Sequence, residues 1–216
     1  MTTLGKAPPA STLRLAILLL AAGEGSRLGS VPKALLKKDG ESLLQHFYQA
    51  ALALSPVQFI IVSGFHAQAI EAELASLKCD GDMPIHLVLN THPELGQSSS
   101  VRIGLEALEE NYDVVLIALC DQPAIGQKEI ADLLNQYELR NADQEMILPM
   151  VGEQRGNPVL FSKKAIENIL AVPGMVCRPF MDEHPELVHI FSTDNEAYIL
   201  DVDTEADIQI LGLQRD

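Results

Sequence analysis

The sequence contains no tryptophan, only 5% aromatic residues and three cysteines, Cys79, Cys120 and Cys177. The cysteines are odd in number, widely spaced and never arranged as Cys-x-x-Cys, which argues against a disulfide framework and a zinc ribbon. The six histidines form no His-x-x-x-His pair, so a transition-metal site has little support. These shortages are typical of a protein kept reduced, and we expect a cytoplasmic location.

Basic residues are also scarce, because 15 Lys and Arg stand against 30 Asp and Glu and give a formal net charge of −15. A charge of this sign repels phosphate backbones and anionic membrane surfaces, so we expect neither nucleic acid nor membrane as a partner. The apolar run 13–22 contains Arg14, stops at Gly23 and is too short to span a membrane. A phosphorylated ligand therefore requires a local site where cations, backbone amides or a metal ion reverse the overall sign.

Hydrophobic residues make up 47% of the 216 positions, which is enough for one large core. Apolar runs alternate with stretches of helical periodicity, the pattern of βαβ units. We expect an α/β fold, a three-layer α/β/α sandwich with a mainly parallel, Rossmann-like sheet, formed by a single domain over 13–216 after a flexible N-terminal segment, 1–12. The expected strands are 13–20, 59–62, 85–89, 114–119 and 146–148, and the expected helices are 43–54, 67–77, 98–109 and 129–139.

The alternation loosens after residue 150, where three prolines between 173 and 185 interrupt a helical stretch whose conformation the sequence does not determine. Regular structure resumes with expected strands at 187–191 and 198–202. A closing helix is expected at 204–211, with Thr204 as its N-cap. In open α/β sheets ligands bind beyond the carboxyl ends of the strands, so we expect the functional residues in the loops at those ends.

The loop after the first strand is rich in glycine and carries two cations. Three glycines within 20–33 let backbone N–H groups converge on an anion, and Arg27 and Lys33 supply positive charge, so the loop predicts a phosphate site. No Gly-Lys-Ser/Thr closes it, which argues against a Walker motif. A dehydrogenase is disfavoured, because Leu28 stands where a dinucleotide fingerprint has its third glycine and Ser63 follows the second strand without a ribose-binding acid.

Carboxylates stand at the ends of two later strands. Asp121 follows the apolar run 114–119, where a carboxylate is well placed to hold Mg²⁺ against phosphate oxygens. Strand periodicity over 198–202 puts Asp201 and Asp203 on one face, so a second carboxylate can complete the metal site. We expect Asp201 to be the ligand and Asp203 to be partly structural.

A polar segment, 90–100, follows the third strand and leads into a helix N-terminus. Free backbone amides and serine hydroxyls there can bind a phosphate or the polar edges of a nucleoside. Serines are also ordinary helix caps, and that alternative stays open for each of them.

These motifs resemble those of the MobA-like NTP transferase family, the nucleotidyltransferases of the molybdenum-cofactor type. The matching elements are Leu-Ala-Ala-Gly-x-Gly-Ser-Arg-Leu-Gly before Pro-Lys, a Gly followed by serines, Asp-Gln-Pro, Gly-x-Pro-Val-x-Phe and Asp-x-Asp-Thr. They occur in the family's order over about residues 14–212.

The resemblance implies a nucleotidyltransferase with the fold of nucleotide-diphospho-sugar transferases, and it implies a role for each matching residue. The implied catalytic residues are Lys33, Arg27 and Asp121, and the implied Mg²⁺ ligands are Asp121 and Asp201. The implied nucleotide-binding residues are Ala21, Ala22, Gly23, Gly25, Ser26, Arg27, Lys33, Asn90, Gly96, Ser99 and Ser100. The implied acceptor-binding residues are Gln122, Gly156, Asn157 and Pro158.

The resemblance also implies substrates. Ala22 stands where guanylyltransferases have glycine and favours CTP over GTP, while molybdopterin is the implied acceptor, with a molybdoenzyme or its chaperone as a transient partner. Two departures from the family pattern are Asn157, where cytidylyltransferases often have histidine, and Glu205, where proline is usual. Two alternatives stay open: the same centre acting on a sugar, polyol or other cofactor-precursor phosphate, and a non-catalytic nucleotide- or cofactor-binding protein.

Overall fold

The computed structural model describes residues 13–77 and 85–215. The segment 1–12, expected to be flexible, and Cys79 lie outside the described residues, and the single-domain assignment over 13–216 stays a prediction. Cys120 and Cys177 are free cysteines. Within the described ranges, no helix is both long and apolar enough to cross a membrane.

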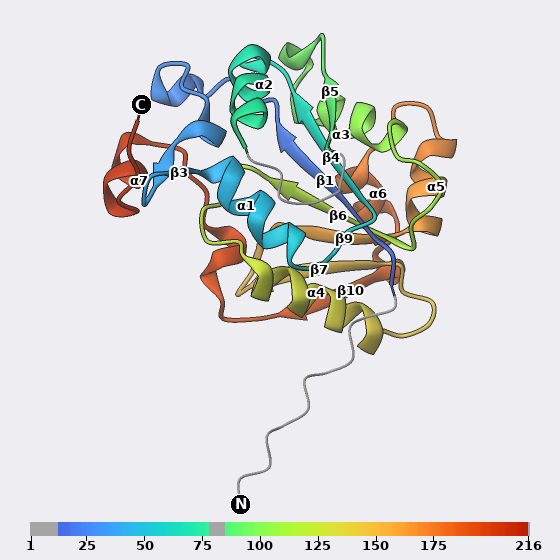
Figure 1. Ribbon diagram of the computed structural model, residues 1–216. Helices are drawn as coiled ribbons and strands as arrows, with labels where there is room; N and C mark the ends of the chain where they lie inside the picture. The colour runs from blue at the N-terminus through green and yellow to red at the C-terminus, as the bar shows by residue number, and fades with distance from the viewer. Residues whose placement is uncertain (1–12, 78–84, 216) are drawn as a thin grey trace, which may run out of the picture.

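An eight-stranded sheet forms the centre of the molecule (Figure 1). Its strands are β1 (Leu15–Ala21), β4 (Gln58–Ser63), β5 (Ile85–Leu89), β6 (Val114–Leu119), β7 (Met146–Val151), β8 (Gln154–Arg155), β9 (Val159–Ser162) and β10 (Val188–Ser192). The strand order is β10-β7-β9-β6-β1-β4-β5, with β8 paired to β7. β9 is antiparallel to β6 and β7, whereas β1, β4, β5 and β6 pair in parallel, as do β7 and β10. The expected mainly parallel sheet is confirmed.

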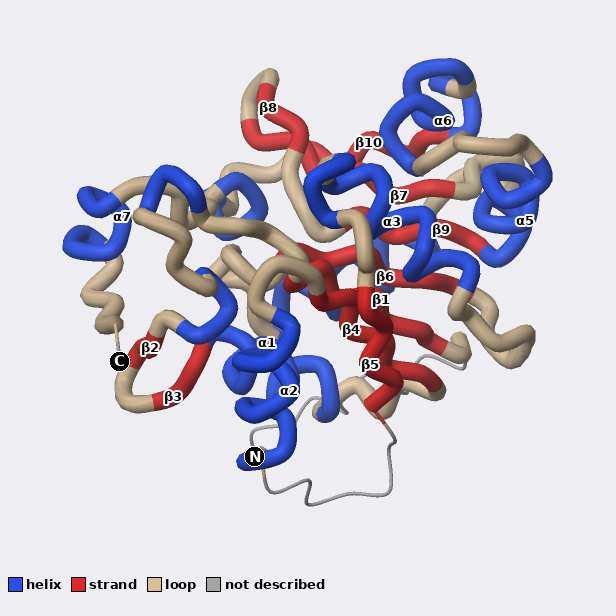
Figure 2. Tube along the Cα trace, turned by 90° about the horizontal axis from the view of Figure 1, so that it is seen from above, coloured by secondary structure: helices blue, strands red, loops and turns tan. Residues whose placement is uncertain are grey.

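Helices cover both faces of this sheet, which confirms the three-layer arrangement (Figures 1 and 2). They are α1 (Leu43–Leu52), α2 (Ala67–Ser76), α3 (Gln97–Glu106), α4 (Gln127–Leu139), α5 (Lys163–Ala171) and α6 (Cys177–Glu183). A further helix, α7 (Glu205–Ile210), lies beside the sheet, where Ile208 packs in a separate cluster with Leu28 and Leu36 (Figure 1). Alternate residues of β1 pack to opposite sides: Ile17 joins the core formed with α1 and α4, and Leu18 the core formed with α3, α5 and α6. This two-sided burial explains why β1 is an uninterrupted apolar run.

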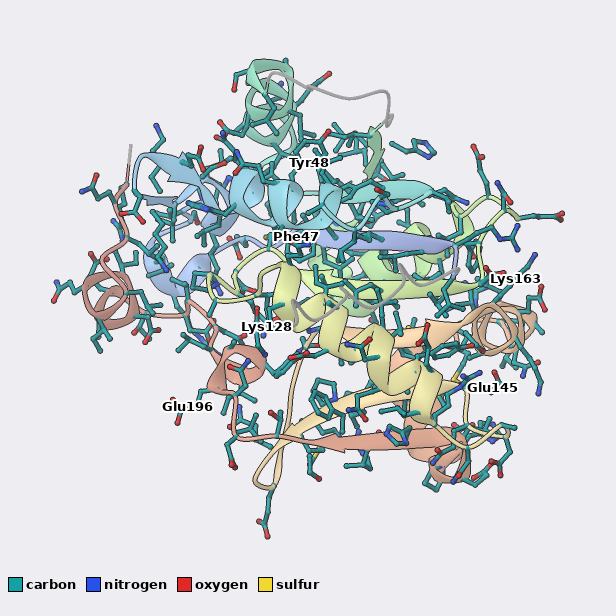
Figure 3. All side chains as sticks on the ribbon, turned by 60° about the horizontal axis from the view of Figure 1, so that its bottom comes forward. Phe47, Tyr48, Lys128, Glu145, Lys163 and Glu196 are labelled. Atoms are coloured by element: carbon teal, nitrogen blue, oxygen red, sulfur yellow. The ribbon has the colours of Figure 1, made fainter. Side chains whose placement is uncertain are left out.

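The packing of α1 on the sheet depends on aromatic contacts (Figure 3). Phe47 and Tyr48 of α1 both pack against Phe59 of β4, with ring centroids 6.3 and 5.5 Å apart. Ser42 caps the helix by accepting a hydrogen bond from the Gln45 backbone N–H. A short antiparallel pair, β2 (Lys37–Lys38) with β3 (Glu41–Ser42), leads into this cap.

The expected strand at 198–202 is wrong, because the structure has a 3₁₀ turn at Glu196–Ile199 followed by irregular backbone. Tyr198 is fully buried, and its hydroxyl donates to the Glu129 carbonyl of α4. The Tyr198 carbonyl accepts from the backbone N–H of Asn157 and from the side chain of Gln122. Residues outside any neighbouring strand therefore form the hydrogen bonds of this segment. The closing helix is confirmed as α7, with Thr204 as its N-cap.

Candidate active site

A cavity of about 510 Å³ lies at the carboxyl ends of the parallel strands β1, β4, β5 and β6, where ligands bind in open α/β sheets. We call it the first cavity. The implied nucleotide-binding and catalytic residues that line it are Ala21, Ala22, Gly23, Gly25, Lys33, Gly96, Ser100 and Asp121. The structure thus brings together three loops that are far apart in the sequence.

The glycines of the loop after β1 serve different purposes. Gly25 has φ of +67°, and a Cβ there would lie 2.0 Å from the Val31 carbonyl oxygen, so the turn itself requires glycine. At Gly23 an added Cβ would meet no atom within 4 Å. Since Gly23 lines the cavity, its missing side chain leaves room for a ligand against the backbone. Ser26 and Arg27 lie in a short 3₁₀ turn, Ser26–Leu28, and do not line the cavity themselves.

Four charged side chains form a connected cluster beside the first cavity. Lys33 Nζ lies 3.0 Å from Asp121 Oδ2 and 2.7 Å from Asp203 Oδ1. The other oxygen of Asp203 lies 2.8 Å from a guanidinium nitrogen of Arg27. A backbone hydrogen bond from Val202 to the Asp121 carbonyl brings the two segments side by side. Asp203 therefore holds both implied catalytic cations.

The cluster changes the proton affinities of its members. Burial opposes the charge of Lys33, but Asp121 and Asp203 outweigh it and raise the pKa of Lys33. The hydrogen bond from Lys33 lowers the pKa of Asp203. For Asp201, partial burial of the carboxyl and the negative charge of Asp121 raise the pKa to about 6.

The presence of two carboxylates, Asp121 on the first cavity and Asp201 near it, is the feature that fits a divalent cation. Across residues 13–77 and 85–215, no group of three or more His, Cys, Asp or Glu side chains can hold a metal ion. Two carboxylates with substrate phosphates and water are nevertheless the usual surroundings of Mg²⁺. Burial is the main cause of the raised pKa of Asp201 and the charge of Asp121 adds to it; a cation bound by both carboxylates would offset that second cause. The residues present therefore fit Mg²⁺ held jointly by protein and nucleotide.

The segment after β5 lies at the opposite wall of the first cavity. Gly96, with φ of +89°, precedes α3, and Ser100 on the first turn of that helix lines the cavity. Asn90 is only 1% exposed, and its amide donates to the hydroxyls of Ser99 and Ser100. Asn90 thus holds the two serine hydroxyls in place through hydrogen bonds, but it does not line the cavity itself.

A second cavity of about 480 Å³ adjoins the first, because Leu20, Gln97 and Leu119 line both. Of the implied acceptor-binding residues, Gly156 and Asn157 line the second cavity, and so does Asp201. Pro158 and Gln122 do not line it. Gln122 is 4% exposed and donates to the Tyr198 carbonyl, so it supports the site from inside the protein.

Gln97 and Arg178 are polar lining residues that lie outside the predicted site. Gln97, the first residue of α3, lines both cavities, and its position directly after Gly96 was the available signal. Arg178 of α6 lines the second cavity. It lies in the proline-interrupted stretch, where the sequence pattern gave no indication of its surroundings.

Several solved structures are similar to this one. The structure of Rv0371c from Mycobacterium tuberculosis H37Rv has a TM-score of 0.71 at 21% identity and covers 93% of this chain and 98% of its own. A nucleotidyl transferase from Methanothermobacter thermautotroptrophicus, Mth528, has a TM-score of 0.71 at 18% identity, covering 93% and 96%. These likenesses show a shared fold.

Sequence comparison finds relatives and a family. The bifunctional protein GlmU of Mycobacterium avium strain 104 is 31% identical over 143 residues, 65% of this chain but only 29% of GlmU. The nicotine blue oxidoreductase of Paenarthrobacter nicotinovorans is 29% identical over 198 residues, covering 87% of this chain and 91% of that protein. Residues 17–187 match the MobA-like NTP transferase domain, and this stretch includes the loop after β1 and Asp121. On that match, this chain belongs to the MobA-like NTP transferase family.

Proposed function

We propose that the protein is a Mg²⁺-dependent nucleotidyltransferase that transfers a nucleotidyl group from CTP to molybdopterin and releases pyrophosphate. The observation that carries the proposal is the pair of adjoining cavities with Asp121 on one and Asp201 on the other. A donor in the first cavity and an acceptor in the second meet at these two carboxylates. Family membership supports the reaction class, and a similar solved structure, the complex of Rv0371c with manganese, supports a divalent metal.

The chain's own residues account for the chemistry of such a transfer. A phosphate oxygen of the acceptor attacks the α-phosphorus of the NTP, the bond to the bridging oxygen breaks, and pyrophosphate leaves with the electron pair. Lys33 neutralises charge at the α-phosphate, and Arg27 with the loop amides holds the remaining phosphates. No general base is required, because the acceptor phosphate is already ionised. Asp121 and Asp201 would hold Mg²⁺, which would supply further charge neutralisation.

The choice of substrates rests on narrower observations. CTP is favoured by Ala22, which stands where guanylyltransferases have glycine. Molybdopterin is supported by the walls of the second cavity, which are largely apolar: Val101, Ile117, Leu148, Val159, Phe161 and Met181. Such walls suit a flat ring system better than the hydroxyl groups of a sugar or polyol phosphate, the alternative acceptors for the same centre.

The test is pyrophosphate release with each of CTP, GTP, ATP and UTP, in Mg²⁺, Mn²⁺ or EDTA, with and without molybdopterin. We expect release with CTP, molybdopterin and metal together. Lys33→Ala and Asp121→Asn should each lower the rate by roughly two orders of magnitude or more. Lys128→Ala is the matched control, because Lys128 is an exposed residue of α4 paired with Asp132. Full activity in Lys33→Ala or Asp121→Asn would overturn the mechanism.

A reductase is the second candidate, because the relative that matches over 91% of its own length is named nicotine blue oxidoreductase. Against it stand Leu28 in the place of the third fingerprint glycine and Ser63 at the end of β4. Oxidation of NADH or NADPH, followed at 340 nm with a quinone dye as acceptor, separates the two candidates. Turnover of NAD(P)H without pyrophosphate release from any NTP would favour the reductase, and binding of NTP without turnover would favour a non-catalytic protein.

A further inference from the structure

Arg178 differs from most cations of this acidic protein in its surroundings. Acidic residues outnumber basic ones by two to one, and Arg14, Arg27, Lys33, Arg102, Arg155 and Arg215 all form ion pairs. Arg178 forms no ion pair and no hydrogen bond with any residue that the structure describes. Its guanidinium group is uncommitted there, although carboxylates are abundant.

The helix that carries Arg178 is nevertheless anchored. On the same short helix, α6, the side chains of Cys177, Phe180 and Met181 are buried in the core. At its other end, Asp182 pairs with Arg155 of β8 at 2.6 Å, which ties the helix to the β7–β8 hairpin. Arg178 itself is exposed, so this anchoring fixes the backbone from which its side chain extends and leaves the guanidinium accessible to a ligand.

The segment that leads into α6 is anchored as well. Arg102 of α3 donates to the carbonyl oxygens of Ile169, Leu170, Val172 and Met175, at 3.0–3.3 Å. These carbonyls belong to the last turn of α5 and the connection to α6. Since the first turn of α3 lines both cavities, Arg102 attaches the outer wall of the second cavity to the helix that separates the two.

The surroundings of Arg178 indicate which kind of ligand it can bind. Arg178 lines the second cavity together with Asp201 and the apolar side chains described above. An unpaired guanidinium beside apolar walls is complementary to a molecule that carries an anionic group on a flat apolar body. We infer that Arg178 binds the anionic group of the acceptor and so determines acceptor specificity. This inference rests on the proposed function for the identity of the reaction but not for the binding itself.

Phenyl phosphate is a suitable probe, because it combines an aromatic ring with a phosphate monoester. Its dissociation constant is measured by calorimetry for the wild-type protein and for Arg178→Ala, Arg178→Lys, Lys38→Ala and Lys33→Ala. Arg178→Ala should weaken binding roughly tenfold or more, and Arg178→Lys by less, since lysine keeps the charge but loses the two-pronged geometry. Lys38→Ala is the control for net charge, because Lys38 lies on β2 and lines neither cavity.

The outcomes separate this inference from the proposed function. The inference would be overturned if Arg178→Ala and wild type bound phenyl phosphate with equal affinity. It would also be overturned if wild type showed no binding at about 10 mM phenyl phosphate. A loss of phenyl phosphate binding in Lys33→Ala alone would place the phosphate in the first cavity and would also overturn the inference. If an acceptor supports pyrophosphate release, Arg178→Ala should raise the KM for the acceptor with little change in the KM for CTP. Absence of pyrophosphate release with intact, Arg178-dependent binding contradicts only the proposed reaction.

Discussion

One carboxylate, Asp203, connects Lys33, which lines the first cavity, with Arg27, which lies beside it. Its two oxygens hold Lys33 and Arg27, at 2.7 and 2.8 Å. A phosphate entering between these cations therefore competes with Asp203 for them, and the competition favours nucleotides whose charge is already partly balanced by a metal ion. This competition is how the proposed site would accept a metal-bound mononucleotide in a protein with net charge −15.

The glycines of the loop after β1 allow a paired prediction. Gly23→Ala should leave the free energy of unfolding unchanged within about 0.5 kcal/mol, because an added Cβ meets nothing. It should weaken CTP binding about tenfold or more, since the methyl group blocks approach to the backbone amides. Gly25→Ala should lower both stability and affinity, because of its positive φ and the clash with Val31. Denaturant unfolding and calorimetric titration of CTP with Mg²⁺ measure both; unchanged affinity in Gly23→Ala would contradict a phosphate at this loop.

Asp201 allows a prediction about pH. Its pKa in the folded protein is about 6, above the ordinary value of 3.8. The folded state therefore holds the proton more tightly than the unfolded state, and the ionised carboxyl destabilises the fold. This destabilisation is fully present above pH 6 and is lost as the pH falls to about 4 and below. In metal-free protein, Asp201→Asn should stabilise by about 1 kcal/mol at pH 8, a value reduced because solvent reaches this partly buried carboxyl, and by much less at pH 4.

Thermal unfolding in EDTA at both pH values measures this difference. Glu138→Gln, an exposed substitution on α4 with the same charge change, is the control. If Asp201→Asn were no more stable than wild type at pH 8, the ionised Asp201 carboxyl would not destabilise the folded protein.

Helix α3 is the element on which both cavities depend. Its first turn lines the two cavities, and its side chain at Arg102 holds the connection between α5 and α6. Close packing on the sheet fixes its position, because Gly104 lies directly over Leu18 of β1 and Val62 of β4.

Gly104→Ala should therefore destabilise the protein by about 1–2 kcal/mol, although alanine has the higher helix propensity. The new Cβ would lie 2.4 Å from Leu18 Cδ1, and Leu18 is fully buried in a close-packed core that leaves it no room to move. Chemical denaturation measures the loss, with Gly23→Ala as the matched glycine-to-alanine control. A stabilised Gly104→Ala protein would mean that α3 can shift away from the sheet.

The molecule as a whole combines a strong net negative charge with a site in which cations and carboxylates are paired. The 30 acidic residues repel one another across the surface, and this self-repulsion opposes the compact state. The cations Lys33, Arg155 and Arg178 line the two adjoining cavities, together with Asp121 and Asp201.

Added salt should therefore stabilise the protein. Between 20 and 500 mM NaCl we expect Tm to rise by about 2–5 °C, because the screening length falls from over 20 Å to about 4 Å. Most of the gain should come below 200 mM if screening is the cause. KCl should give the same curve, and a Tm that falls with salt would mean that surface ion pairs outweigh the net repulsion.

The amino-acid sequence by itself determined the alternation of strands and helices and the family. Period-two and helical patterns depend on local neighbours, and so do the glycine turns, as at Gly25. The tertiary structure alone decided the rest. Tyr198 lies in a 3₁₀ turn because Glu129, Asn157 and Gln122 satisfy its polar groups. Asn90 and Gln122 are buried, and Arg178 has no partner among the described residues. Burial and pairing depend on residues that folding brings together, so a local sequence pattern does not predict them.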